Sequence, residues 1–234
     1  MKKRIGSCML LFLLCAVLFV SCTADSAANE KMAEAVAQGF SECYTPIRQS
    51  NPMMLGQGKA FLAELTGDDA PEAVILYDNH HTAGAMVLSP EGNVLAQFET
   101  TSFYHDTNLA FSIYAGPKGK VLASRAIEYG SAPDERTAVT EEYLSFSADQ
   151  VEQRQLFYIA NEKTGDLTYF ESPQSSQIIS AQEFQARSAQ ILGDGELLET
   201  IELKKQDEPV DLMDAAGLQS YLLEQLDRYN GIEP

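Results

Sequence analysis

The sequence predicts an α+β fold, in which an antiparallel β-meander sheet is flanked by an N-terminal helix and two C-terminal helices. Apolar residues recur at helical spacing near both ends of the chain. Between them, residues 59–179 hold short β-branched and aromatic segments separated by Gly, Pro and Asn turns, a pattern typical of antiparallel strands. The chain is also long enough to bury a core without disulfide bonds.

Residues 1–21 are predicted to be a signal peptide. Lys2, Lys3 and Arg4 form a cationic start, and residues 9–20 are all apolar. A helix that crosses a bilayer needs about 20 apolar residues. This apolar run is shorter, which favours a cleaved leader over a membrane span.

Cys22 is the predicted lipidation site. Residues 19–22, Phe-Val-Ser-Cys, resemble the bacterial lipobox, although Phe19 stands where Leu is usual. The resemblance implies cleavage before Cys22, palmitate-type acylation of the chain, and attachment to the extracytoplasmic face of the cell membrane. The alternative is ordinary secretory cleavage after Ala24. With cleavage before Cys22, residues 22–28 form a lipidated tether and residues 29–234 a single domain.

The chain is strongly acidic, with a formal net charge of −18. Loss of the leader removes three positive charges and leaves about −21. Such a surface repels nucleic acid and anionic lipid, so we expect membrane contact through the N-terminal lipid alone. The charge suits cation binding and equally suits simple solubility. Cys43 is the one thiol left after processing, which excludes an internal disulfide.

The helices are predicted from apolar periodicity and capping residues. The first runs from Asn29, a plausible N-cap, to Tyr44, before Pro46. A second runs from its cap Ser180 to Leu192, and a third covers 211–229. In the second, Glu183 completes a capping box and Gly193 ends the helix. The apolar stripe of the first helix is Met32, Val36, Phe40, Cys43 and Ile47.

Nine strands are predicted from alternation and from β-branched or aromatic content. Two of their turns, 90–96 and 117–123, resemble each other at an offset of 27 residues. This offset suits either a structural repeat or two hairpins with the same turn chemistry. The predicted strands are 60–65, 73–77, 85–88, 94–98, 109–114, 121–125, 142–146, 155–159 and 167–170.

Residues 61–76 form an apolar strand, an acidic turn and a second apolar strand. This segment resembles the FG-GAP or VCBS-type hairpins of bacterial surface proteins, which hold calcium in the turn. The resemblance implies a site in which oxygen ligands come from Glu64, Thr66, Asp68, the Ala70 carbonyl and Glu72. Glu64 and Thr66 replace the usual Asp, and a non-Gly residue stands at the bend. The loop therefore either binds Ca²⁺ or keeps the hairpin shape without an ion.

This hairpin is followed by a strand meander, by Tyr-rich strands and by the helix start at residues 178–184, Ile-Ile-Ser-Ala-Gln-Glu-Phe. That order is similar to that of uncharacterised lipoproteins of Gram-positive gut bacteria, a resemblance that implies a location and no activity. We expect a non-enzymatic binding or interaction module at the cell surface, with a protein or glycan partner. The alternatives are an envelope hydrolase whose site comes from distant residues, and an envelope assembly factor.

No catalytic residue is predicted. His105 and Asp106 lie in a loop, and the sequence has no Gly-x-Ser-x-Gly elbow to complete a triad. The adjacent His80 and His81 point to opposite faces of an extended chain, so they rarely share one metal ion. The aromatic candidates for a binding face are Tyr143, Phe146, Phe157, Tyr158, Tyr169 and Phe170.

Overall fold

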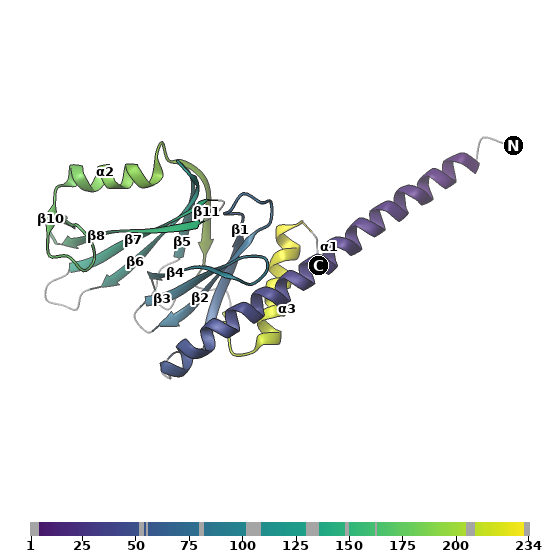
Figure 1. The fold of residues 1–234 in the computed structure, drawn as a ribbon, viewed down its shortest axis with the longest axis horizontal. Helices are drawn as coiled ribbons and strands as arrows, with labels where there is room; N and C mark the ends of the chain where they lie inside the picture. The colour runs from purple at the N-terminus through teal and green to yellow at the C-terminus, as the bar shows by residue number, and fades with distance from the viewer. Residues whose placement is uncertain are drawn as a thin grey trace.

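The fold is a layered α+β structure, which confirms the predicted class (Figure 1). In this computed structural model two antiparallel sheets pack face to face. Helices α1 (Ile5–Ser50) and α3 (Ala215–Tyr229) cover the outer face of one sheet, and α2 (Ala181–Leu192) covers the outer face of the other. The structure describes residues 5–51, 54, 56–79, 82–101, 109–129, 136–147, 150–161, 163–204 and 209–231.

The first sheet has five strands in the order β12-β1-β2-β3-β4. We call it sheet A. Strands β1 to β4 form a meander, and β12 returns from the C-terminal region to pair with β1. The strands of sheet A are β1 (Gln57–Ala63), β2 (Glu72–Asn79), β3 (Thr82–Leu88), β4 (Val94–Thr101) and β12 (Val210–Asp211).

The second sheet, sheet B, has seven strands in the order β10-β9-β8-β7-β6-β5-β11. The nine predicted strands are all present, and most are longer than predicted because pairing extends past the apolar residues. The three strands that were not predicted are β10, β11 and β12. The strands of sheet B are β5 (Leu109–Gly116), β6 (Gly119–Tyr129), β7 (Arg136–Ser147), β8 (Gln150–Asn161), β9 (Leu167–Phe170), β10 (Ile178–Ile179) and β11 (Glu196–Leu203).

The two similar turns belong to different sheets. The turn that starts at Pro90 joins β3 to β4 in sheet A, and the turn that starts at Pro117 joins β5 to β6 in sheet B. Each closes a hairpin, but the two hairpins lie in separate layers of the sandwich. The two similar sequences therefore mark hairpin turns in two separate sheets. Among the described residues, they do not form a ring of repeated blades.

Helix α1 is longer than predicted at both ends. It begins at Ile5 and includes residues 22–28, the predicted tether, because the alanines of that segment favour helix. Asn29 is therefore not an N-cap; its buried side chain donates to Asp227 and accepts from Asn230, both at 2.9 Å. The helix also passes Pro46, since the packing of the next turn on the core outweighs one missing hydrogen bond.

The other two helices match the prediction more closely. The Ser180 hydroxyl accepts from the Glu183 amide at 3.1 Å, and the Gly193 N–H closes α2. The Glu183 carboxylate pairs with Arg187 at 2.8 Å, so the predicted capping box is only half formed. Helix α3 begins at Ala215, not at 211, because the side chain of Asp214 caps it.

Three apolar layers hold the sheets and helices together. Phe61 of sheet A and Phe111 of sheet B meet between the sheets, with ring centroids 4.8 Å apart. Phe40 and Tyr44 of α1 stack on each other and pack on the outer face of sheet A. Under α2, Phe184 packs on tyrosines of sheet B. Both faces of each sheet are thus covered, at least in part.

Candidate functional site

The lipidation prediction rests on the sequence alone. Cys22 lies within the backbone of α1. In the part of the chain that the structure describes, no helix is both long and apolar enough to cross a bilayer.

The predicted calcium ligand Glu72 is fully buried at the start of β2. Its two carboxylate oxygens accept hydrogen bonds from the Leu65 amide at 2.7 Å and from the Thr66 hydroxyl at 2.8 Å. Burial raises the pKa of Glu72, against the opposing effect of these hydrogen bonds. Two of the predicted ligands, Thr66 and Glu72, therefore bind each other.

The carboxylates of Glu64 and Asp68 are also engaged by protein donors. Glu64 accepts from the Gly67 amide and forms an ion pair with Lys120 of β6, whose ammonium also donates to the Glu64 carbonyl at 2.9 Å. Asp68 accepts from the Ala70 amide at 3.1 Å. Asp69 makes the sharp bend with a φ of 66°. Within the described ranges, no group of three or more His, Cys, Asp or Glu side chains could hold a metal ion.

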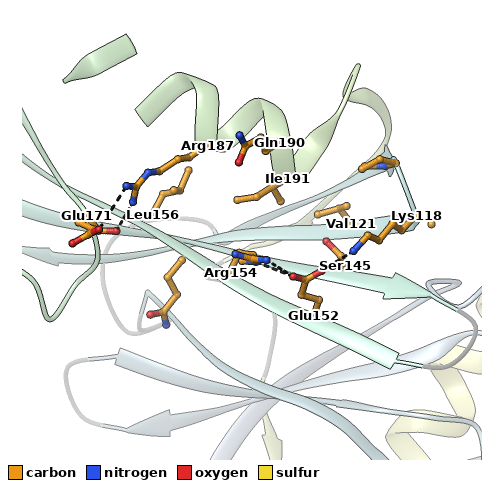
Figure 2. Close-up of a pocket in the computed structure, with 13 residues that line it drawn as sticks. Lys118, Val121, Ser145, Glu152, Arg154, Leu156, Glu171, Arg187, Gln190 and Ile191 are labelled. Atoms are coloured by element: carbon orange, nitrogen blue, oxygen red, sulfur yellow. Dashed lines mark hydrogen bonds and ion pairs between the residues drawn. The ribbon is translucent and has the colours of Figure 1, made fainter. Parts of the chain in front are cut away.

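A cleft of about 390 Å³ lies between α2 and the outer face of sheet B, and we call it the α2 cleft (Figure 2). Phe184, near the start of α2, rests on Tyr169 with a centroid separation of 4.5 Å, which fixes that end of the helix on the sheet. Towards the other end of α2, Val121, Leu156 and Ile191 form an apolar wall. Arg187 and Glu171 lie at one end of the cleft, and Lys118 and Glu152 lie at the other (Figure 2).

At one end of the α2 cleft, two cations share one carboxylate. The Lys118 ammonium lies 3.3 Å from Glu152 Oε2, and Arg154 Nε donates to Glu152 Oε1 at 3.0 Å. Arg154 and Lys118 together lower the pKa of Glu152. This group of three side chains carries a net positive charge, and we call it the cationic end.

At the other end, one cation is held by two carboxylates. Arg187 of α2 lies 2.8 Å from Glu183 and 3.8 Å from Glu171, and it also donates to the Glu171 carbonyl at 3.0 Å. This group carries a net negative charge, and we call it the acidic end. Glu183 itself lies outside the lining of the cleft, next to Arg187, so the clusters at the two ends carry opposite net charges when this neighbouring carboxylate is counted.

A second cavity, of about 260 Å³, lies at one end of the space between the sheets. Glu142 of β7 lines it and is 2% exposed. The side-chain amides of Gln155 and Gln153 donate to its carboxylate at 2.5 and 3.3 Å. Burial raises the pKa of Glu142, and the negative charge of Glu99 across the cavity adds to the effect.

The six candidate aromatic residues do not form one binding face. Tyr143 lies on the α2 side of sheet B and Phe146 lies between the sheets, as their odd spacing predicts. Phe157 packs against Phe170, with centroids 5.4 Å apart. Tyr158 and Tyr169 lie beneath α2, where Phe184 contacts both rings. Most of these rings are thus used in packing.

Among the described residues that line the α2 cleft, Ser145 is the only one with a hydroxyl side chain, and none is a His. The arrangement suits binding by charge and apolar contact, because a hydrolytic nucleophile needs an adjacent base. His80, His81, His105 and Asp106 lie outside the described residues.

The residues that line the α2 cleft come from three strands, two turns and a helix, and no sequence motif marks them. The one available signal was the scarcity of basic residues, 16 against 34 acidic ones. Comparisons with protein-family models, curated proteins and solved structures gave no match.

Proposed function

We propose that the protein is a lipid-anchored, extracytoplasmic binding module that holds a small polar molecule in the α2 cleft. One observation carries the proposal: the cleft combines an apolar wall with charged groups at both ends. Its volume of about 390 Å³ lies in the range of small-molecule sites, which are mostly apolar with a few placed polar groups.

The charge distribution supports this site over the rest of the surface. The chain has an excess of 18 acidic side chains, yet three cations line this one cleft. Arginine and lysine placed among apolar side chains recognise anionic groups of a ligand by charge-assisted hydrogen bonds. The proposed location comes from the leader and from Cys22, which would hold the cleft outside the cytoplasmic membrane.

Mass spectrometry of the membrane-extracted protein tests the anchor. We expect an N-terminal peptide that begins at Cys22 and carries the added mass of acyl chains. The Cys22→Ala variant should not be processed in this way and should lose its lipid mass. Identical processing and membrane retention of the parent and the variant would contradict the lipid anchor.

A thermal-shift panel of small metabolites tests the binding site in the processed protein, with melting followed by circular dichroism. Ligand that binds the native state raises the melting temperature. We expect at least one compound to stabilise the parent and not the Ser145→Trp variant, in which an indole fills the cleft. Ser176→Trp, at an exposed position between β9 and β10, is the matched control and should respond like the parent. A panel with no stabilising compound contradicts the proposed site.

A further inference from the structure

We propose that the ligand of the α2 cleft is a short peptide with free termini, bound with its carboxylate at the cationic end and its amine at the acidic end. The inference rests on the proposed function and deepens it. It follows from the opposite net charges of the two ion-pair clusters, the acidic one including Glu183 beside the cleft, and from the apolar wall that lines the cleft.

The cationic end has spare capacity for a carboxylate. Lys118 has three N–H donors and Arg154 has five, and both are paired with the single carboxylate of Glu152. Their side chains are 64% and 61% exposed, so the remaining donors reach the cleft opening. A ligand carboxylate placed here would balance the second positive charge.

The acidic end has the opposite imbalance. Arg187 satisfies part of the charge of Glu171 and Glu183, and one of the two negative charges is left over. A ligand ammonium would balance it, and the Glu171 side chain is open to solvent on the cleft side. A phosphate or a dicarboxylate fits poorly, because its second negative charge would meet this end.

The middle of the cleft suits the body of a peptide. Val121, Leu156 and Ile191 offer an apolar surface for a side chain. Gln190 and Ser145 lie along the same stretch and can donate to or accept from a peptide group (Figure 2).

The test uses isothermal titration calorimetry on the processed protein, with the tripeptide alanyl-leucyl-alanine as the probe. Two further probes are its C-terminal amide and its N-acetyl form. We expect the free tripeptide to bind, and each blocked form to bind about tenfold more weakly, since each loses one charge-assisted contact.

Two variants assign the ends. Arg154→Gln should weaken the free tripeptide about tenfold and leave the affinity for the amide unchanged. Glu171→Gln should weaken the free tripeptide and leave the N-acetyl form unchanged. Arg125→Gln is the matched control, because Arg125 is 63% exposed, is paired with Glu141 on β7 of the same sheet, and lies outside the cleft. It should bind like the parent.

Equal affinity for all three probes overturns the proposal, and so does the absence of binding at millimolar tripeptide. If the tripeptide fails but another compound stabilises the parent and not Ser145→Trp, the peptide inference is wrong and the proposed function stands. If no compound of either kind binds, both fail.

Discussion

The ammonium of Lys120 brings a positive charge to the acidic loop between β1 and β2. It contacts both the side chain and the carbonyl of Glu64, from a neighbouring sheet. We expect Lys120→Met to lower the free energy of unfolding by about 1.5 to 3 kcal/mol, because hydrogen bonds to charged groups contribute roughly that amount. Urea denaturation of the parent and the variant measures the difference.

The same substitution changes the expected response to calcium. In the parent, Glu64 and Glu72 are engaged by protein donors, so we expect millimolar Ca²⁺ to leave the melting temperature unchanged. Without the ammonium, the Glu64 carboxylate keeps only the Gly67 amide as a donor, and calcium should stabilise the Lys120→Met variant. A rise in the melting temperature of the parent with added Ca²⁺ would show instead that the loop binds the ion.

Glu142 should make the stability of the protein depend on pH. Its folded pKa is raised above the ordinary value of 4.5, so its contribution is fully present below about pH 4.5 and is lost as pH rises through the folded value. Each unit of that shift corresponds to about 1.4 kcal/mol. Glu142→Gln should therefore flatten the fall in stability between acidic and neutral pH, measured by urea unfolding across that range.

The exposed Glu128 lines the same cavity and gives the control, since Glu128→Gln should keep the slope of the parent. An unchanged slope in Glu142→Gln would mean that the buried carboxylate is not the group responsible.

Helix α1 approaches the β3–β4 turn so closely that two glycines meet. A Cβ added at Gly39 would lie 1.9 Å from the carbonyl oxygen of Gly92. Glycine to alanine in a helix normally stabilises by about 1 kcal/mol. We expect the opposite sign for Gly39→Ala, a loss of about 1 to 3 kcal/mol, because overpacking forces the helix away from the turn. Thermal denaturation tests the sign, and Gln38→Ala on the exposed side of the same helix should change little.

The strands of the meander could be predicted because each has a regular alternation or an apolar run. Strand β11 was not predicted because the adjacent residues Leu197 and Leu198 break the alternation of apolar and polar residues. The strand accommodates them with a shift of register between Leu197 and Glu199. Strands β10 and β12 have two residues each, too few for any periodicity. The division into two sheets was not predicted either. The pattern of residues within a strand does not show that β4 and β5, which follow each other in the chain, belong to different sheets.

The α2 cleft could not be predicted for a different reason. Lys118 and Arg187 are far apart in sequence and lie in one cleft only because α2 folds back over sheet B. Their residue types carry no motif, and either would be read as an ordinary surface charge. The predicted loop at residues 64–72, by contrast, is local in sequence, so its hairpin shape could be anticipated and only its donors, such as Lys120, could not.

The layers of the molecule set its orientation if Cys22 carries lipid. The backbone of α1 is helical from Cys22 to Asn29, and Asn29 is bonded to Asp227 and Asn230 at the end of α3. Seven residues of helix span about 10 Å. The α3 side of the body should then lie near the membrane surface, and β10 and α2 should lie at the far end of the molecule (Figure 1).

Energy transfer to the membrane can test this orientation, because the chain contains no tryptophan. A single donor is introduced either by Tyr229→Trp at the end of α3 or by Ile178→Trp in β10, at positions that are 46% and 65% exposed. In vesicles that contain a dansyl lipid, we expect much stronger transfer from position 229. A flexible Gly-Ser segment inserted after Ser26 should reduce the difference, because the body is then free to tumble on its anchor. Equal transfer from both positions in the uninterrupted chain would show that α1 does not hold the body in a fixed orientation.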